Sequence, residues 1–491
     1  MSAAMTGTSV PAAVACRVST LDTDDVALSA QAAHDTVQLA RDARWHLDAT
    51  VAGSSPRAAV ARDGGLAVLL VGEVPDTGGP DAVLHLFRDL GPCAFSQLSG
   101  RFAAVVVDSA DRSVTVATDH AGTVPLHVVH TWDGHIAVAT EAKALVRLRG
   151  RGRPLPGTQE MPGLGGVRRV RAGTCLSLAG PGQARARRTW VVPAHRELVE
   201  PHLAAEQVRA VVEEAVAWQA RDGMTTVLSG GIDSSAVAAT VRSQRGSVST
   251  VTMGTDRSDE FGPAALVAEH LGAHHTEVST TVASVLAELP IVVALTESAD
   301  PSVNEYLLPL ARLYREIPAG HRVMTGYGAD IPLGGMHRGR ADLALEELIV
   351  EDMSSFDGLN ELSPNLGSHL GLWTSHPYWD RAVLGRLVTL AAGLKRRHGR
   401  DKWVLREAFR DLLPEQTVLR PKLGIHEGSG TTSHWSEVLL ERGVSPADVT
   451  ATKARISRAV YDRVVVDGEA PGAVDLDDLT STVVAAEPVR A

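Results

Sequence analysis

Two patterns of hydrophobic and polar positions follow one another along the chain. Between about Leu66 and Leu178 the apolar runs are short and separated by Gly, Asp and Pro, which is typical of a sheet-rich region. These runs are LAVLLVGEV, RFAAVVVDS, SVTVATD, PLHVVHTW, HIAVATEAKAL and GTCLSLA. A segment rich in Arg, Gly and Pro interrupts them from Arg147 to Arg169. We predict that the linker to the next region is RARRTWVVPAHRE, residues 185–197.

The pattern changes after about Pro201, where strand-like and helix-like segments alternate. Strand-like TTVLSG, VSTVTMG and HTEVS are followed in turn by helix-like SSAVAATVRSQ, PAALVAEHLGA and VASVLAELPIVVAL. Such alternation predicts a parallel, doubly wound sheet. After about Ala341 we expect mainly helix, from LALEELIVEDM through RAVLGRLVTLAAGLKRRHG. The sequence therefore predicts an α/β protein with a β-rich domain over 1–195 and a second domain over 200–491.

Composition and charge limit the classes of partner. The 491 residues are 44% hydrophobic and 21% charged, as in soluble globular proteins, and their formal net charge of -11 offers no basic field to nucleic acid. No apolar run approaches the roughly 18 residues of a membrane helix, and the N-terminal segment lacks the basic start of a signal peptide. Cys16, Cys93 and Cys175 form no CxxC pair, so we expect a reducing cytoplasm. The expected partner is a small molecule, with neither nucleic acid nor membrane, and a homodimer is left open.

The motif SGGIDSS lies where a predicted strand ends and a helix begins. Glycines let the backbone approach an anion closely, and serine hydroxyls and free N–H groups at a helix start can face phosphates. The expected phosphate contacts are Ser229, Gly230, Gly231, Asp233, Ser234 and Ser235. A carboxylate beside phosphate is reasonable if Mg²⁺ lies between them, which assigns Asp233 to the metal. A glycine turn capped by serines is the alternative, and the kinase-type GxxxxGK[ST] loop is absent.

A second carboxylate follows the strand-like run HRVMTG, within TGYGADIPLGG. In a doubly wound sheet, ligand sites gather at the carboxyl ends of the strands. Asp330 is therefore predicted to share the metal with Asp233, although it could simply cap the next helix.

SGGIDSS resembles the SGGxDS loop of the ATP pyrophosphatases, and both halves of the chain resemble the asparagine synthetase superfamily. In the N-terminal half the resemblance rests on GRFAAVVVDS, ATDHAGTVPL and VATEAKAL. It implies an Ntn-hydrolase-like domain of the glutamine amidotransferase type, followed by an ATP pyrophosphatase domain (adenine nucleotide α-hydrolase-like) with added helices. Working amidotransferases of this type use a cysteine at the mature N-terminus. Because Ser2 follows Met1 and Cys16 lies within ACRV, we expect that the glutaminase activity is lost.

The active-site loop departs from the asparagine synthetases, which carry a glutamate where this chain has Tyr327 in GYGADIPLGGM. A phenol is a poor substitute for the charge of a carboxylate, but it can take part in proton transfer. Together with EYLLPL, FDGLNE, HPYWDR, AGLKRRHGRDKWVLR and RPKLGIHEGSGTTS, this loop resembles the β-lactam synthetase branch of the superfamily. The resemblance implies that a carboxylate is adenylated with ATP and Mg²⁺, and that an amine of the same molecule then closes a four-membered lactam.

The resemblance also implies roles for single residues. Tyr327 and Glu361 would form a catalytic dyad that takes the proton from the amine, and Lys422 would stabilise the oxyanion of ring closure. Lys402 is expected to reach the pyrophosphate, with a basic helix face as the alternative. The expected adenine contacts, through backbone groups, are Met253 and Gly254.

Substrate choice rests on fewer residues. In the clavulanate-pathway branch the substrate is N2-(2-carboxyethyl)-arginine, whose guanidinium needs an acidic partner. Asp352 matches the family's candidate, and a solvated helix charge is the alternative. Tyr306 is expected to be a wall of the pocket or a core aromatic residue. Gly326 and Gly328, on either side of Tyr327, would permit close approach to the substrate.

Other functions remain open at this point. A carbapenam synthetase with a carboxymethylproline substrate would not need the acidic Asp352, and a lasso-peptide cyclase would need a precursor peptide. An asparagine synthetase is disfavoured by Tyr327. From a different class, the chain could be a nucleotide-binding sensor that has lost catalysis.

Overall fold

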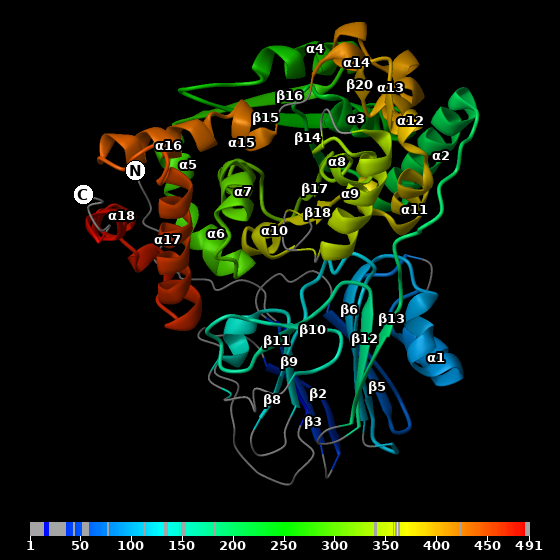
Figure 1. The fold of residues 1–491 in the computed structure, drawn as a ribbon. Helices are drawn as coiled ribbons and strands as arrows, with labels where there is room; N and C mark the ends of the chain where they lie inside the picture. The colour runs from blue at the N-terminus through cyan, green and yellow to red at the C-terminus, as the bar shows by residue number, and fades with distance from the viewer. Residues whose placement is uncertain are drawn as a thin grey trace.

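The computed structural model describes residues 14–18, 36–42, 45–51, 58–75, 78–111, 113–131, 136–146, 148, 154–179, 183–337, 341–356, 358, 361, 364–421 and 424–486. Figure 1 shows a β-rich part, coloured blue to teal, below a parallel sheet surrounded by helices, coloured green to red. The chain is therefore an α/β protein in which the two patterns of the sequence correspond to two kinds of sheet.

The β-rich part contains two antiparallel sheets. One has the strand order β10 (Thr158–Glu160), β11 (Arg168–Val170), β8 (His127–His130), β9 (Ile136–Ala139), β1 (Val14–Val18), β3 (Trp45–Val51) and β2 (Thr36–Asp42). The other has the order β13 (Ala184–Arg188), β12 (Thr174–Leu178), β7 (Ser113–Thr118), β6 (Arg101–Asp108), β5 (Leu66–Glu73) and β4 (Ala58–Asp63). The six strand-like runs of the sequence are confirmed as β5 to β9 and β12.

Alternation along the strands builds a core on each face of the second sheet. Leu69 and Val105 cluster with side chains of the first sheet, such as Val128. Their neighbours Leu70 and Ala104 instead cluster with helix α1 (Pro80–Leu90). Successive side chains of a strand point to opposite faces, and both faces of this sheet are buried. The sequence of these strands is therefore a nearly unbroken run of apolar residues.

The predicted linker is wrong in its first residues. Ala184 to Arg188 form β13, which pairs with β12 at the edge of the second sheet. Four arginine and alanine side chains of this strand, from Arg185 onward, are exposed, and such charged edges are common where a sheet must not pair further.

The second part is built on a parallel sheet with the order β16 (His274–Thr280), β15 (Ser249–Thr255), β14 (Thr225–Val227), β17 (Arg322–Met324) and β18 (Trp373–Ser375). Met324 packs with α2 (Pro201–Gln219), α3 (Ile232–Arg245) and α4 (Phe261–Leu271). Its neighbour Val323 packs with α6 (Leu289–Thr296), α7 (Pro301–Tyr314) and α17 (Val449–Tyr461). Helices thus cover both faces, and the predicted doubly wound sheet is confirmed.

Two predicted helices are broken. VASVLAELPIVVAL forms α5 (Val282–Leu286) and then α6, which starts again at Leu289 with Pro290 in its first turn. RAVLGRLVTLAAGLKRRHG forms α11 (Arg381–Thr389), α12 (Ala392–Lys395) and the first residues of a short strand pair. The break at Leu390 has a physical cause, because this residue leaves the helix to pair in parallel with Glu197 of the linker.

The remaining helices surround the sheet's carboxyl edge and its flank. They are α8 (Asp330–Leu333), α9 (Asp342–Ser355), α10 (Asn365–His369), α13 (Trp403–Ala408), α14 (Glu415–Leu419), α15 (Ile425–Gly428), α16 (Thr431–Glu441) and α18 (Leu476–Ala485). Within the described ranges, no single helix has the length and apolar character needed to cross a membrane. Only Val282–Thr296 and Pro301–Tyr314, bent by 112° and counted together, reach that length and composition.

Candidate active site

The SGGIDSS motif forms the predicted turn between β14 and α3. Gly230 has a φ of 69°, and a Cβ there would lie 2.4 Å from the carbonyl group of Pro263, so a larger residue would not fit. The hydroxyls of Ser229 and Ser234 are 3.1 Å apart. The Ser234 hydroxyl also accepts a hydrogen bond from the Ser229 N–H at 3.1 Å. The loop is thus held by its own serines at the start of a helix, where free N–H groups favour an anion.

Two carboxylates meet beside this loop, as the sequence predicted. Asp233 lies in the first turn of α3, and Asp330 is the first residue of α8, after β17. The Lys402 Nζ lies 2.5 Å from Asp233 Oδ2 and 2.7 Å from Asp330 Oδ1. The Lys402 side chain is 1% exposed, so this trio is nearly closed to solvent.

Lys402 therefore contacts the two carboxylates that the sequence assigned to the metal. It precedes α13 with a φ of 56°, an uncommon backbone conformation for a residue with a side chain. A strained residue held between two acidic groups points to function rather than to a solvated helix face. The contact with pyrophosphate stays a prediction.

The carboxylate pair fits a magnesium site of the kind that nucleotides complete. Mg²⁺ is usually held by one or two carboxylates together with substrate phosphates and water. In the described part of the chain, no group of three or more His, Cys, Asp or Glu side chains is arranged to hold a metal alone. Asp233 and Asp330 would be the protein ligands, and the ion would offset charge on the phosphates.

The phosphate loop and the Tyr327 loop are in direct contact. A Cβ on Gly326 would lie 2.4 Å from the Ser234 nitrogen. A Cβ on Gly328, whose φ is 98°, would lie 1.7 Å from Trp379 Nε1. Both glycines predicted to allow close approach are therefore required by packing against the protein itself. Their contact with a substrate stays a prediction.

Tyr327 is half-buried in a cluster of rings. Its ring centroid lies 5.4 Å from that of Tyr306, 5.9 Å from that of His376, and 6.4 Å from that of Trp379, to which it is nearly parallel at 18°. Trp379 stacks in turn on Phe356, with 4.1 Å between centroids. Aromatic walls of this kind suit a pocket that holds a substrate and excludes water.

Glu361 is buried next to this cluster. Its Oε1 accepts a hydrogen bond of 2.8 Å from the Tyr314 hydroxyl, and its Oε2 accepts one of 3.2 Å from the Tyr306 hydroxyl. Burial raises the pKa of Glu361 to about 7, against hydrogen bonds that favour its charged form. A carboxyl group poised near neutral pH is suited to proton transfer.

The predicted dyad partners thus lie in one cluster, with Tyr306 linking them. The Tyr306 ring packs against Tyr327 while its hydroxyl donates to Glu361. Burial and the nearby carboxylate raise the pKa of Tyr306 well above its ordinary value, so this phenol stays protonated. The catalytic roles of Tyr327 and Glu361 stay predictions.

The sequence did not single out several members of this cluster. Tyr314 lies eight positions after Tyr306 on α7, about two helical turns further and about 80° around the helix, and this helical spacing could have found it. His376 and Trp379 belong to the HPYWDR block, which carried the resemblance without any assigned role. His376 is fully buried, and its Nδ1 lies 2.7 Å from the Thr325 hydroxyl.

Asp352 does not stand as an open carboxylate. Its Oδ2 lies 2.6 Å from His337 Nε2, with both side chains partly exposed. It follows Glu351 on α9, and its neighbour Met353 packs in the same cluster as Trp379 and Tyr327. Asp352 therefore lies on a helix that packs against the aromatic cluster, and binding of a guanidinium by Asp352 stays a prediction.

Other predicted residues are only partly placed. Met253 is buried in β15, and a Cβ on its neighbour Gly254 would lie 2.5 Å from the Asp259 Cβ. The contact of these two residues with adenine stays a prediction. Lys422, Met1 and Ser2 lie outside the described residues. Cys16 is in β1, with its backbone paired to β3 and β9.

A cavity of about 400 Å³ opens beside the phosphate loop. Its lining residues are Gly230, Gly262, Pro263, Leu266, Gln416, Thr417, Leu419 and Arg420. Arg420 donates to the Ser229 carbonyl at 2.8 Å and to Glu260 at 2.9 Å, which ties the phosphate loop to the segment that leads toward residue 422.

The comparisons with known proteins agree with this combination of an amidotransferase-type region and a nucleotide-activating sheet. The chain matches the asparagine synthase family over residues 207–372 and 365–470. It matches the glutamine amidotransferase domain over residues 73–147. The chain belongs to the asparagine synthase family, and this membership implies an ATP-utilising synthetase.

Among individual relatives, the carboxyethyl-arginine beta-lactam-synthase of Streptomyces clavuligerus is 48% identical over 427 residues, which are 86% of this chain and 82% of that protein. The glutamine-hydrolysing asparagine synthetase of Homo sapiens is 27% identical over 403 residues, 74% of this chain and 69% of that protein. The match to the solved structure of an NMN synthetase from Francisella tularensis extends over 59% of this chain and 94% of the synthetase chain, at 13% identity. Its TM-score of 0.27 is too low to support an argument.

Proposed function

We propose that this protein closes a β-lactam ring in N2-(2-carboxyethyl)-L-arginine, using ATP and Mg²⁺ and releasing AMP and pyrophosphate. The observation that carries the proposal is the contact between two sites. Asp233 and Asp330, the two carboxylates that contact Lys402, serve adenylation. The cluster of Tyr327 and Glu361 serves ring closure. Gly326 joins them by packing on Ser234. The 48% identity to a carboxyethyl-arginine beta-lactam-synthase supports the same substrate.

In the first step the substrate carboxylate attacks the α-phosphorus of ATP, and the bond to pyrophosphate breaks. The N-terminal turn of α3 would bind the phosphates, and Asp233 and Asp330, which contact Lys402, would hold Mg²⁺, which would offset charge on the phosphates. The phosphate loop thus orients the nucleotide, and its serines replace the water that a free phosphate would bind.

In the second step the amine nitrogen attacks the acyl carbon, and AMP leaves with the electron pair of the broken C–O bond. Tyr327 takes the proton from the amine as its own phenolic proton moves toward Glu361. The pKa of Glu361, raised to about 7 by burial, suits this carboxyl group to accept a proton at neutral pH. The aromatic walls hold both ends of the substrate together and keep water from the acyl-adenylate.

The direct test is to incubate the purified protein with Mg·ATP and carboxyethyl-arginine. We expect AMP, pyrophosphate and a product that has lost one water, in equal amounts, by mass spectrometry and phosphate assays. Carboxymethylproline, and aspartate with ammonia, serve as competing substrates. Release of pyrophosphate without that mass loss would contradict the lactam assignment, and formation of asparagine would assign the protein to the amide-forming reaction of asparagine synthetases instead.

A further inference from the structure

The segment ATDHAGTVPL of the β-rich part forms a rigid turn at the boundary with the parallel-sheet part. Asp119 is 2% exposed, and its carboxylate accepts hydrogen bonds from the N–H groups of Phe102 at 3.0 Å and Ala121 at 2.9 Å. It also accepts from the N–H and hydroxyl groups of Thr123. A carboxylate that satisfies so many donors fixes the backbone of residues 119–123. The turn is therefore a rigid platform.

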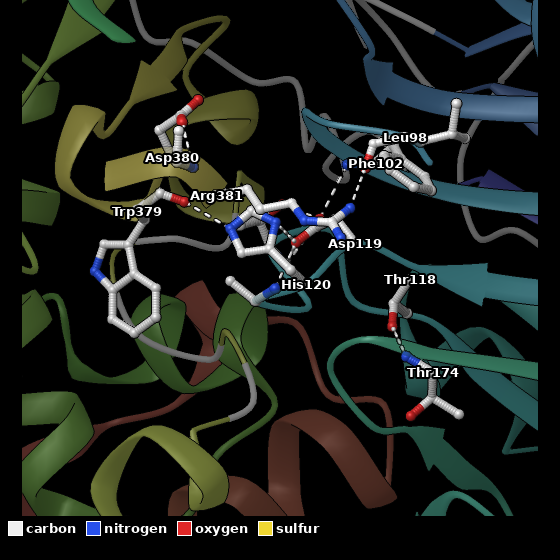
Figure 2. Close-up of polar contacts among 12 residues, drawn as sticks. Leu98, Phe102, Thr118, Asp119, His120, Thr174, Trp379, Asp380 and Arg381 are labelled. Atoms are coloured by element: carbon white, nitrogen blue, oxygen red, sulfur yellow. Dashed lines mark hydrogen bonds and ion pairs between the residues drawn. The ribbon is translucent and has the colours of Figure 1, made fainter. Parts of the chain in front are cut away.

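This platform contacts the parallel-sheet part at Trp379, whose ring stacks on that of Tyr327. His120 is buried, and its Nε2 donates to the Trp379 carbonyl at 2.8 Å, since a carbonyl group can only accept. Figure 2 shows the His120 ring pointing at this carbonyl, and the Arg381 side chain reaching back to Leu98. Arg381 donates to the carbonyls of Ser96 and Leu98 at 2.9 Å and 3.0 Å.

The same turn touches the segment that carries Glu361. A Cβ on Gly358 would lie 2.1 Å from the Gly122 carbonyl oxygen, so the two backbones are in van der Waals contact. Gly358 has a φ of 74° and lies three positions before Glu361. Residues 119–122 thus contact both Trp379, which stacks on Tyr327, and the segment that ends at Glu361.

We infer that the turn 119–123 of the amidotransferase-like part positions Tyr327 and Glu361 for ring closure, with His120 as a positioning residue. This inference rests on the proposed function. Ring closure competes with attack by water on the acyl-adenylate, and a near-attack geometry is lost with small displacements. A loosened Trp379 lets the Tyr327 ring move and admits water, whereas the phosphate loop keeps its own contacts. The β-rich part therefore acts on the second chemical step and leaves the first unaffected.

The test measures two quantities in each variant of the full-length protein. One is the amount of lactam formed per ATP consumed, and the other is the exchange of labelled pyrophosphate into ATP. His120→Phe keeps a ring against Trp190, whose centroid lies 5.8 Å from that of His120, but it removes the donor to Trp379. We expect lactam per ATP to fall about 10-fold, with exchange within about twofold of the unchanged protein. The remaining adenylate is hydrolysed to AMP and the starting carboxylate.

Two further variants separate positioning from loss of folding. His120→Gln retains an N–H donor near the Nε2 position, so it should keep most of the lactam formed per ATP consumed, the quantity called coupling below. Thr115→Val is the matched control, because Thr115 is buried in β7 and bonds Ser177 at 3.0 Å within the same β-rich part. It should leave coupling unchanged even if the melting temperature falls. If His120→Phe does not fold, Arg381→Met decides, since it frees the same segment from the β-rich part.

The outcomes of the two proposals differ. If the unchanged protein forms no lactam, the proposed function is wrong. The inference about the turn is wrong if the unchanged protein forms lactam and His120→Phe, or Arg381→Met in its place, forms the same amount of lactam per ATP consumed. An equal fall of exchange and lactam in these variants would also overturn it, because the turn would then act on the whole fold.

Discussion

The phosphate loop and the Tyr327 cluster lie against each other but are built in different ways. The loop is seven consecutive residues in which the Ser229 and Ser234 hydroxyls bond each other, and its neighbours Asp330 and Lys402 come from the same parallel-sheet part. The cluster combines α7, the loop after β17, Glu361 and the segment 376–379, and it rests on a turn of the β-rich part. The phosphate loop itself is therefore encoded locally and is completed by residues of its own part, while the Tyr327 cluster depends on packing between the two parts.

The largest effect is expected when the lysine between the two carboxylates is replaced. Lys402→Met leaves Asp233 and Asp330 facing each other without a cation, and breaking a buried ion pair in this way is expected to reduce the free energy of unfolding by about 3–5 kcal/mol. We also expect pyrophosphate exchange to fall at least about 100-fold, measured on protein shown to be folded. Lys395→Met is the control, because Lys395 is equally buried but donates to the Val388 carbonyl on α11. Normal exchange in Lys402→Met would exclude the lysine from adenylation.

The second change separates the two sites. Tyr327→Phe keeps the ring packing against Tyr306 and Trp379 but removes the phenol, so lactam formation should fall about 10²- to 10⁴-fold. Pyrophosphate exchange should stay within a few-fold, because the proposed phosphate contacts lie in the turn between β14 and α3.

Tyr461→Phe removes another buried phenol, one that donates to the Pro162 carbonyl and packs in the core cluster of α6 and α7, and it serves as control. Equal losses of exchange and lactam in Tyr327→Phe would show that Tyr327 supports the fold.

The third prediction concerns pH. Because the pKa of Glu361 is raised to about 7, a ring closure that needs its charged form should rise with pH through about 7. Glu361→Gln should lower lactam formation and remove that rise, while exchange keeps its own pH dependence. A pH profile of lactam formation unchanged in Glu361→Gln would assign the titration to another group.

The same shift has a consequence for stability. The folded-state pKa lies above the usual 4.5, so between about 4.5 and about 7 the folded protein holds a proton that the unfolded chain has released. Glu361 therefore contributes a loss of stability as pH rises through this window. Urea unfolding should show a shallower loss in Glu361→Gln than in the unchanged protein, and an identical slope would contradict the raised pKa.

The smallest effect is expected at Tyr314, which acts on the cluster through Glu361. Tyr314→Phe removes the 2.8 Å hydrogen bond to Glu361 Oε1, which favours the charged carboxylate. The pKa of Glu361 should rise further, and the pH limb of lactam formation should move upward by about one unit. Activity well above that limb should recover. A simple drop at every pH would indicate that Tyr314 only packs the core.

The sequence predicted the local features and missed the long-range ones. The seven-residue loop, the position of Asp330 after a strand, and the doubly wound sheet follow from spacing and periodicity, and the structure bears them out. The contact of Lys402 with both carboxylates could not be read in this way, because residue 402 is separated from Asp233 by most of the second part.

Of the cluster around Glu361, the sequence predicted the pair of Tyr327 and Glu361, with Tyr306 as a wall of the pocket or a core aromatic residue. The helical spacing of Tyr306 and Tyr314 gave a signal for Tyr314 alone, and nothing in the sequence says that His376 and Trp379 meet these residues. The break at Leu390 was missed for the same reason, since it depends on a backbone pairing with Glu197. Tertiary contacts decided these features, and local propensity did not.

The arrangement of Lys402 also bears on the order in which ligands arrive. Lys402, Asp233 and Asp330, taken as a trio, carry one more negative than positive charge beside the phosphate loop. That remaining charge repels an uncomplexed nucleotide and attracts a cation, so ATP should enter with its metal already bound. Nucleotide affinity should then depend steeply on free Mg²⁺ at low ionic strength, as measured by calorimetry, and this dependence should weaken as added salt screens the site.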